Sequence, residues 1–143
     1  MPMTVQEPNH YKYTLATGGI DFESDTFKMV LLAPAFSAFD VDTHATYSDL
    51  TNEIADGNGY TTGGVTLTLD AVTENDTTDK LEVTWNNQTI TASGGDIPDF
   101  KFVVVYDDTS TDNTIIFCVD LDTTISLTDG LSFIANNIKH EIV

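Results

Sequence analysis

The sequence predicts a mainly β protein with a single domain, built as an antiparallel β-sandwich or a barrel-like sheet, with one or two short helices near the N-terminus. Three observations predict this fold class. Apolar and polar residues alternate with period two along several short segments. Clusters of Gly, Asn and Asp, which favour turns, separate these segments. Strong helix formers are sparse, whereas threonine, β-branched and aromatic residues recur along the chain.

The N-terminal segment is expected to lie outside the sheet. Pro2 and Pro8 indicate an extended arm over residues 1–9, ahead of a single β-rich domain over residues 10–143. A short helix is expected within residues 9–17, because Asn9 is a favourable N-cap and a Gly-Gly pair follows the segment.

Strands are expected along most of the remaining chain. A strand over residues 25–33 precedes one or two helical turns over residues 46–54. From residue 65 onward, strands and turns follow one another at the spacing of a sandwich or barrel. These strands are expected at residues 65–71, 81–85, 89–92, 100–106 and 114–121. The last two carry apolar residues at nearly every position and are expected to be buried on both faces. One face should hold Phe100, Phe102, Val104 and Tyr106.

Charge excludes several classes of partner. The chain of 143 residues carries 23 acidic residues and 5 lysines, has no arginine, and has a formal net charge of -18. Nucleic acids and anionic membranes both require cationic surfaces, so neither is expected as a partner. The hydrophobic content of 41% is enough to build a core, which excludes a disordered acidic tail.

The residues that carry chemistry form no catalytic pattern. Cys118 lies in an apolar run and is interpreted as buried, and the three histidines show no pairing with a nucleophile. Asp120 and Asp122 are expected to share the solvent face of a strand, where a glycosidase acid is disfavoured. We therefore expect no enzyme activity and no cofactor, and we assign no metal ligand. Three acidic loops leave a weak cation site open as an alternative: residues 56–59, 75–79 and 107–112.

The N-terminus has neither the basic region nor the apolar stretch of a signal peptide, and the longest apolar run is too short to span a bilayer. The single cysteine excludes an intrachain disulfide, so a soluble product made in a reducing compartment is expected.

Three segments resemble a family of small virion proteins of tailed bacteriophages. They read IDFESDTFKMVLL at 20–32, DTHATYSDLTNEI at 42–54 and GNGYTTGGVTL at 57–67. The family pattern is a strand similar to DTFKVAL, followed by YSDVTNE and GYTxGG. Later strands match as well, so the resemblance covers roughly residues 20–143. It implies a structural component of the particle, similar to capsid decoration (cement) proteins, rather than an enzyme.

The resemblance also implies partners and a location. The chain is expected to bind the major capsid protein on the outer surface of the head, to form a homotrimer with copies of itself, and to assemble in the host cytoplasm. Candidate contact residues are Met3, Val5, Pro8, Lys12, Phe36 and Phe39. The loop that begins at residue 93 is a further candidate contact surface, because relatives run on more directly there.

A tail- or fibre-associated adhesin that binds host surface glycans is the alternative. It requires exposed loop aromatics, for which the candidates are Tyr47, Tyr60, Phe36 and Phe39.

A structural turn is expected at the GYTTGG motif. Gly57, Gly59, Gly63 and Gly64 should let the backbone bend sharply around Tyr60, so that the Tyr60 ring packs on the sheet.

Overall fold

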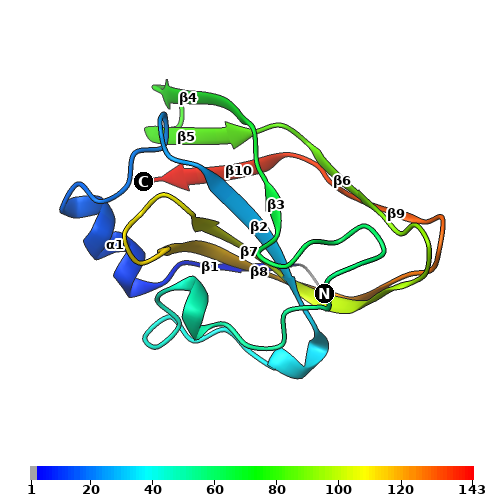
Figure 1. The fold of residues 1–143 in the computed structure, drawn as a ribbon. Helices are drawn as coiled ribbons and strands as arrows, with labels where there is room; N and C mark the ends of the chain where they lie inside the picture. The colour runs from blue at the N-terminus through cyan, green and yellow to red at the C-terminus, as the bar shows by residue number, and fades with distance from the viewer. Residues whose placement is uncertain (1–2) are drawn as a thin grey trace.

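Ten strands, one α-helix and two 3-10 helices follow one another in residues 3–143, the part of the chain that the computed structural model describes (Figure 1). In chain order they are β1 (Thr4–Gln6), α1 (Asn9–Ala16), β2 (Phe27–Leu32), η1 (Pro34–Phe36), η2 (Tyr47–Asp49), β3 (Val65–Thr66), β4 (Leu69–Asn75), β5 (Lys80–Trp85), β6 (Gln88–Thr91), β7 (Ile97–Asp107), β8 (Ile115–Leu127), β9 (Ser132–Ala135) and β10 (Ile138–Ile142). The predicted mainly β class with a short N-terminal helix is confirmed.

The strands form an open sandwich. One layer is a five-stranded antiparallel sheet in the order β1-β8-β7-β2-β3. The other layer is a bent ribbon in which β5 pairs with β10, β6 pairs with β9, and β4 pairs with the outer edge of β5 (Figure 1). The ribbon bends where Asn86-Asn87 lies opposite Asn136-Asn137, and the amide of Asn137 donates to the side-chain oxygen of Asn87. The sheets do not close into a barrel.

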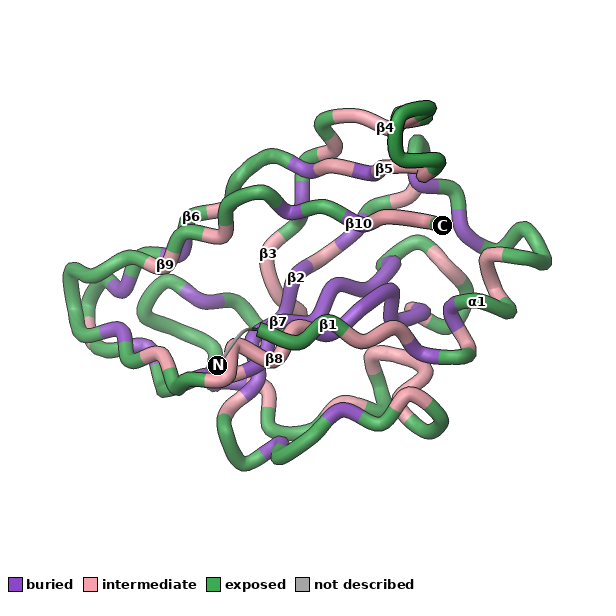
Figure 2. The backbone as a smooth tube through the Cα atoms, turned by 180° about the vertical axis from the view of Figure 1, so that it is seen from behind, coloured by how far each residue is buried: buried purple, intermediate pink, exposed green. Residues whose placement is uncertain are grey.

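The central strands β2 and β7 of the five-stranded sheet are largely buried, and residues of both faces lie in a core, as the apolar pattern predicts (Figure 2). Between the two layers lies the larger core, whose members include Met29, Val105 and Trp85. On the opposite face lies a second core around Phe102 and Val104, covered by the segment that carries η1 and η2.

The face expected for β7 is corrected at one residue. Phe100 belongs to the larger core, whereas Phe102 belongs to the second one. The register shifts between these two residues, where Phe100 pairs with Ile125 but Phe102 pairs with Asp120. This bulge turns Phe100 to the other face of the sheet.

The arm expected over residues 1–9 is also corrected. Met1 and Pro2 lie outside the described residues, but β1 pairs with β8 in register, with Thr4 opposite Asp120. This segment is therefore an edge strand of the domain. Asn9 begins α1 and is not its N-cap, and its side chain donates to Asp42 at 2.6 Å.

Two expected strands have other limits. The strand at 65–71 is divided into β3, which pairs with β2 in the five-stranded sheet, and β4, which pairs with β5 in the other layer; the amide of Leu67 donates to the carbonyl of Phe27 and continues the β2–β3 pairing. The strand at 114–121 continues to Leu127. At Asp122 it takes a left-handed conformation with φ 60°, and the Asp122 amide donates to the Asp120 carboxylate. Asp120 and Asp122 therefore do not share a regular strand face.

Candidate functional site

The two central motifs converge on the carboxylate of Glu53. The hydroxyl of Tyr47 donates to Glu53 Oε1, and the hydroxyl of Tyr60 donates to Glu53 Oε2 at 2.6 Å. The amide of Gly63 donates to the same Oε2 at 2.8 Å. One half-buried carboxylate thus joins YSDLTNE to GYTTGG, and we call these four residues the Glu53 cluster.

Local backbone chemistry places Glu53. Thr46 and Asp49 form a capping box around η2, in which each side chain binds the other residue's backbone. Asn52 then takes a positive φ of 63°, and its carbonyl accepts from the amide of Ala33 at 2.7 Å. This contact holds Glu53 against the end of β2, as the bridge between Leu32 and Glu53 shows.

Tyr106 extends the cluster from β7. Its ring stacks on Tyr47 with centroids 4.7 Å apart, and its hydroxyl donates to the carbonyl of Gly63 at 2.7 Å. Burial raises the pKa of Tyr106 to about 12, and burial with the Glu53 contact raises the pKa of Tyr47 and of Tyr60 further. The three phenols therefore stay protonated and act as hydrogen-bond donors.

The predicted glycine turn is confirmed around Tyr60, which is 2% exposed. All four motif glycines have positive φ. A Cβ on Gly59 would lie 2.1 Å from the carbonyl oxygen of Thr91, and one on Gly64 would lie 2.2 Å from that of Met29. Glycine is needed at these two positions because another backbone passes directly against them.

A second candidate site lies along β1, at the open side of the sandwich. Met3 and Val5 are 63% and 61% exposed, which is unusual for apolar residues on a sheet. They line a largely apolar groove of about 410 Å³ between β1, β8 and the β9–β10 segment. Other apolar residues in its lining are Val119, Leu121, Phe133 and Ile134.

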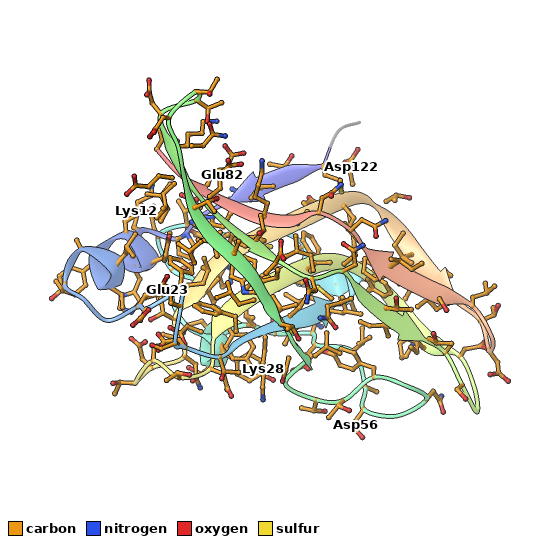
Figure 3. The ribbon with its side chains drawn as sticks, turned by 90° about the horizontal axis from the view of Figure 1, so that it is seen from above. Lys12, Glu23, Lys28, Asp56, Glu82 and Asp122 are labelled. Atoms are coloured by element: carbon orange, nitrogen blue, oxygen red, sulfur yellow. The ribbon has the colours of Figure 1, made fainter. Side chains whose placement is uncertain are left out.

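The groove continues into a charged cavity of about 430 Å³. The residues that line this cavity are Val5, Glu7, Lys12, Phe117, Lys139, His140 and Glu141. We call the groove and this cavity together the β1 surface. Lys12 is exposed on α1 here, away from Lys28 and Asp56 (Figure 3). Within residues 3–143, Lys12 forms no ion pair, whereas the other four lysines each pair with a carboxylate.

His140 forms the floor of the charged cavity. Its Nε2 lies 2.7 Å from the Tyr11 hydroxyl, and its Nδ1 lies 3.4 Å from Glu7 Oε2. Burial lowers the pKa of His140 to about 4, so the ring is neutral near pH 7. The ring also stacks on Phe117 at 5.7 Å. The contact between Tyr11 and His140 joins α1 to β10 inside the fold, and the sequence did not indicate this contact.

Three of the predicted contact residues are not on the surface. Phe36 and Phe39 are each 7% exposed, and both pack around His44 over the second core. Pro8 is buried as well. The apolar loop that carries the two phenylalanines covers the sheet, so it is not available as a contact surface. The aromatics expected of a glycan-binding adhesin are therefore buried or, at Tyr47, half-buried.

The remaining candidates for chemistry lie apart from one another. Asp56 accepts a hydrogen bond from the amide of Thr62 at 2.8 Å and so closes the glycine turn. Cys118 is 1% exposed, and burial raises the pKa of its thiol to about 12. Within residues 3–143, no three acidic, histidine or cysteine side chains are grouped as a metal ion requires. No helix in this part of the chain has the length and apolar character to span a lipid bilayer.

Comparisons of the chain with protein-family models, with curated proteins and with solved structures found no match. The likeness to phage virion proteins stays a prediction from the motifs quoted above.

Proposed function

We propose that this chain is a structural protein of a tailed-bacteriophage virion, a decoration protein that binds the outer surface of the head and stabilises it. Its partners are the major capsid protein and further copies of itself in a homotrimer. The observation that carries the proposal is the Glu53 cluster, because the motifs behind the resemblance are used in packing: Tyr47 packs against the second core, and Tyr60 lies in the larger one. These residues are therefore engaged in holding the fold together, which supports a structural role for the motifs.

The β1 surface is the contact region that we assign to the capsid protein. An edge strand offers unpaired backbone groups, and exposed apolar side chains beside a groove are typical of protein contacts. Met3 and Val5 supply the apolar part, and the ammonium of Lys12 supplies a cation for an acidic group of the capsid.

The net charge supports a position outside the shell. A chain of charge -18 facing the packaged DNA would be repelled by the phosphates. On the outer surface, the same carboxylates would keep a particle with many copies soluble.

The experiment is a binding assay with purified expanded capsids of the phage that encodes the chain, together with a solution mass. We expect a trimer that binds capsids and protects them from heat. A monomer that does not bind capsids would refute the proposal.

A charge reversal tests the β1 surface separately. Lys12→Glu should weaken capsid binding more at low salt than at high salt, since screening removes the lost attraction. Lys28→Glu makes the same change of charge on β2, away from the β1 surface (Figure 3), and should leave binding near that of the wild type. Equal loss for Lys12→Glu at both salt concentrations would show that Lys12 does not act through its charge.

A further inference from the structure

Asp107, the last residue of β7, has a side chain with no exposure to solvent. Its Oδ1 accepts hydrogen bonds from the amides of Thr109 at 2.9 Å and Ser110 at 3.1 Å. Its Oδ2 is buried and receives no hydrogen bond within the described residues. The carboxyl group beside it belongs to Asp25, in the segment before β2.

Two ionised carboxylates side by side in a buried position repel each other, and burial disfavours the charged form. Burial, first, and the Asp25 carboxyl, second, raise the pKa of Asp107 from 3.8 to about 7. Asp25 Oδ2 is already the acceptor for the amide of Asp21 at 2.9 Å. A proton on Asp107 Oδ2 satisfies the orphaned oxygen, because it converts that oxygen into a donor toward Asp25.

The other charged groups near Asp107 form ion pairs or hydrogen bonds with other partners. Lys28, on β2, pairs with Asp108 at 3.3 Å, and His10, on α1, lies 2.7 Å from Asp112. The Asp21 carboxylate accepts from the amides of Glu23 and Ser24 in its own turn. None of these contacts places a cation or a donor on Asp107 Oδ2.

We propose that one proton shared between Asp25 and Asp107 latches the β7–β8 loop (residues 108–114) to the segment before β2 (residues 21–26). Loss of this proton as the pH rises to neutrality weakens the latch and favours local opening of the loop. The proposal is independent of the decoration role.

The latch acts on a few backbone contacts that can be measured. The amide of Asp108 donates to the carbonyl of Thr26 at 2.8 Å, and the amide of Thr26 donates to Thr109 Oγ1 at 2.8 Å. The same loop reaches η2, since the amide of Tyr47 donates to the carbonyl of Asn113 at 3.0 Å. Opening of the loop therefore also breaks a contact of the segment that carries η1 and η2 and covers the second core.

The sign of the effect follows from proton binding. The closed form holds the proton up to neutral pH, whereas the carboxyl in the open form ionises near its ordinary pKa of 3.8. Stabilisation by the latch is complete below that value and is lost as the pH rises toward 7. Over this window the opening equilibrium constant increases by up to about tenfold per pH unit.

Asp107→Asn is the decisive variant because it imitates the protonated form. Its amide oxygen can accept from Thr109 and Ser110, while its amide group donates to the Asp25 carboxylate. Hydrogen exchange at the amides of Thr26 and Asp108, corrected for the intrinsic rate, should lose protection with rising pH in the wild type. In Asp107→Asn the protection should stay constant.

Asp56→Asn is the matched control, since Asp56 is an exposed aspartate that also accepts a backbone hydrogen bond. It should retain the pH dependence of the wild type. Asp25→Asn provides a second route, because an amide there can donate to ionised Asp107, and it too should abolish the dependence.

Carboxyl carbon chemical shifts supply an independent measurement. An Asp107 carboxyl that titrates near neutrality supports the latch, and one that titrates in the ordinary aspartate range overturns it. Identical pH dependence of protection in the wild type, in Asp107→Asn and in Asp25→Asn would also overturn it. Restored protection on adding millimolar calcium at a pH of about 8 would assign the pair to a metal ion instead of a proton.

Discussion

Replacing Glu53 by glutamine should lower the free energy of unfolding by about 3 kcal/mol. The three hydrogen bonds onto Glu53 come from Tyr47, Tyr60 and Gly63. A hydrogen bond to a charged group contributes about 1.5–3 kcal/mol and one to a neutral group about 1 kcal/mol, so each bond loses on the order of 1 kcal/mol when the charge is removed. The side-chain NH2 group of glutamine would also face the Tyr47 and Tyr60 hydroxyls and the Gly63 amide, which are themselves donors, so at least one of these hydrogen bonds is lost.

Unfolding in urea is readily followed through Trp85, the single tryptophan. It is 3% exposed and packs against Phe22 and Phe27, with centroids 6.3 and 5.5 Å away, so its fluorescence should change when the core opens. Glu74→Gln is the control, because Glu74 is exposed on β4, and it should change stability by less than about 0.5 kcal/mol.

Tyr60→Phe completes a double-mutant cycle with Glu53→Gln. The two substitutions share one hydrogen bond, so their combined effect should fall short of the sum by about 1 kcal/mol. Full additivity, or a Glu53→Gln loss no larger than that of Glu74→Gln, would refute the view that this carboxylate holds the covering segment in place.

Two further predictions concern the glycine turn and the buried histidine. Gly59→Ala should destabilise the fold by more than about 3 kcal/mol, because its Cβ would meet the carbonyl oxygen of Thr91, whereas Gly57→Ala has open space and should cost only about 1 kcal/mol of backbone strain. Equal losses in urea unfolding would contradict the packing argument. The pKa of His140 is lowered to about 4 by burial, so the unfolded chain binds the extra proton between pH 6.5 and 4. The contribution of His140 to stability should therefore decrease by up to about 3 kcal/mol over that range as the pH falls, opposite in sign to the contribution of Asp107, and it is measured as the difference between the wild type and His140→Gln at each pH. Parallel profiles of stability against pH for the wild type and His140→Gln would contradict the prediction that burial lowers the pKa of His140.

The central strands could be predicted from sequence because their burial follows a simple alternation. The two-sided apolar pattern of β7 and β8 correctly indicated a sheet covered on both faces. The bulges escaped prediction, since a bulge changes which face a residue takes without changing residue type. The strand β1 has only three residues, and its pairing with β8 depends on a partner more than a hundred positions away.

The Glu53 cluster was predictable only in part. Glycines around a tyrosine indicate a tight turn, but nothing local shows that Tyr47, Glu53 and Gly63 meet. Phe36 and Phe39 were misassigned because an apolar loop without periodicity resembles a contact surface. The signal that could have corrected this was the second apolar face of β7, which required a cover from elsewhere in the chain.

The contact between Tyr11 and His140 joins residues 129 positions apart. During synthesis on a ribosome, α1 emerges long before the strand that completes its packing, and β1 likewise waits for β8. The N-terminal segment must therefore remain unpaired while most of the chain is made, and the last steps of folding join distant parts of the sequence. Such a topology favours slow folding and a long exposure of apolar strand edges to other nascent chains.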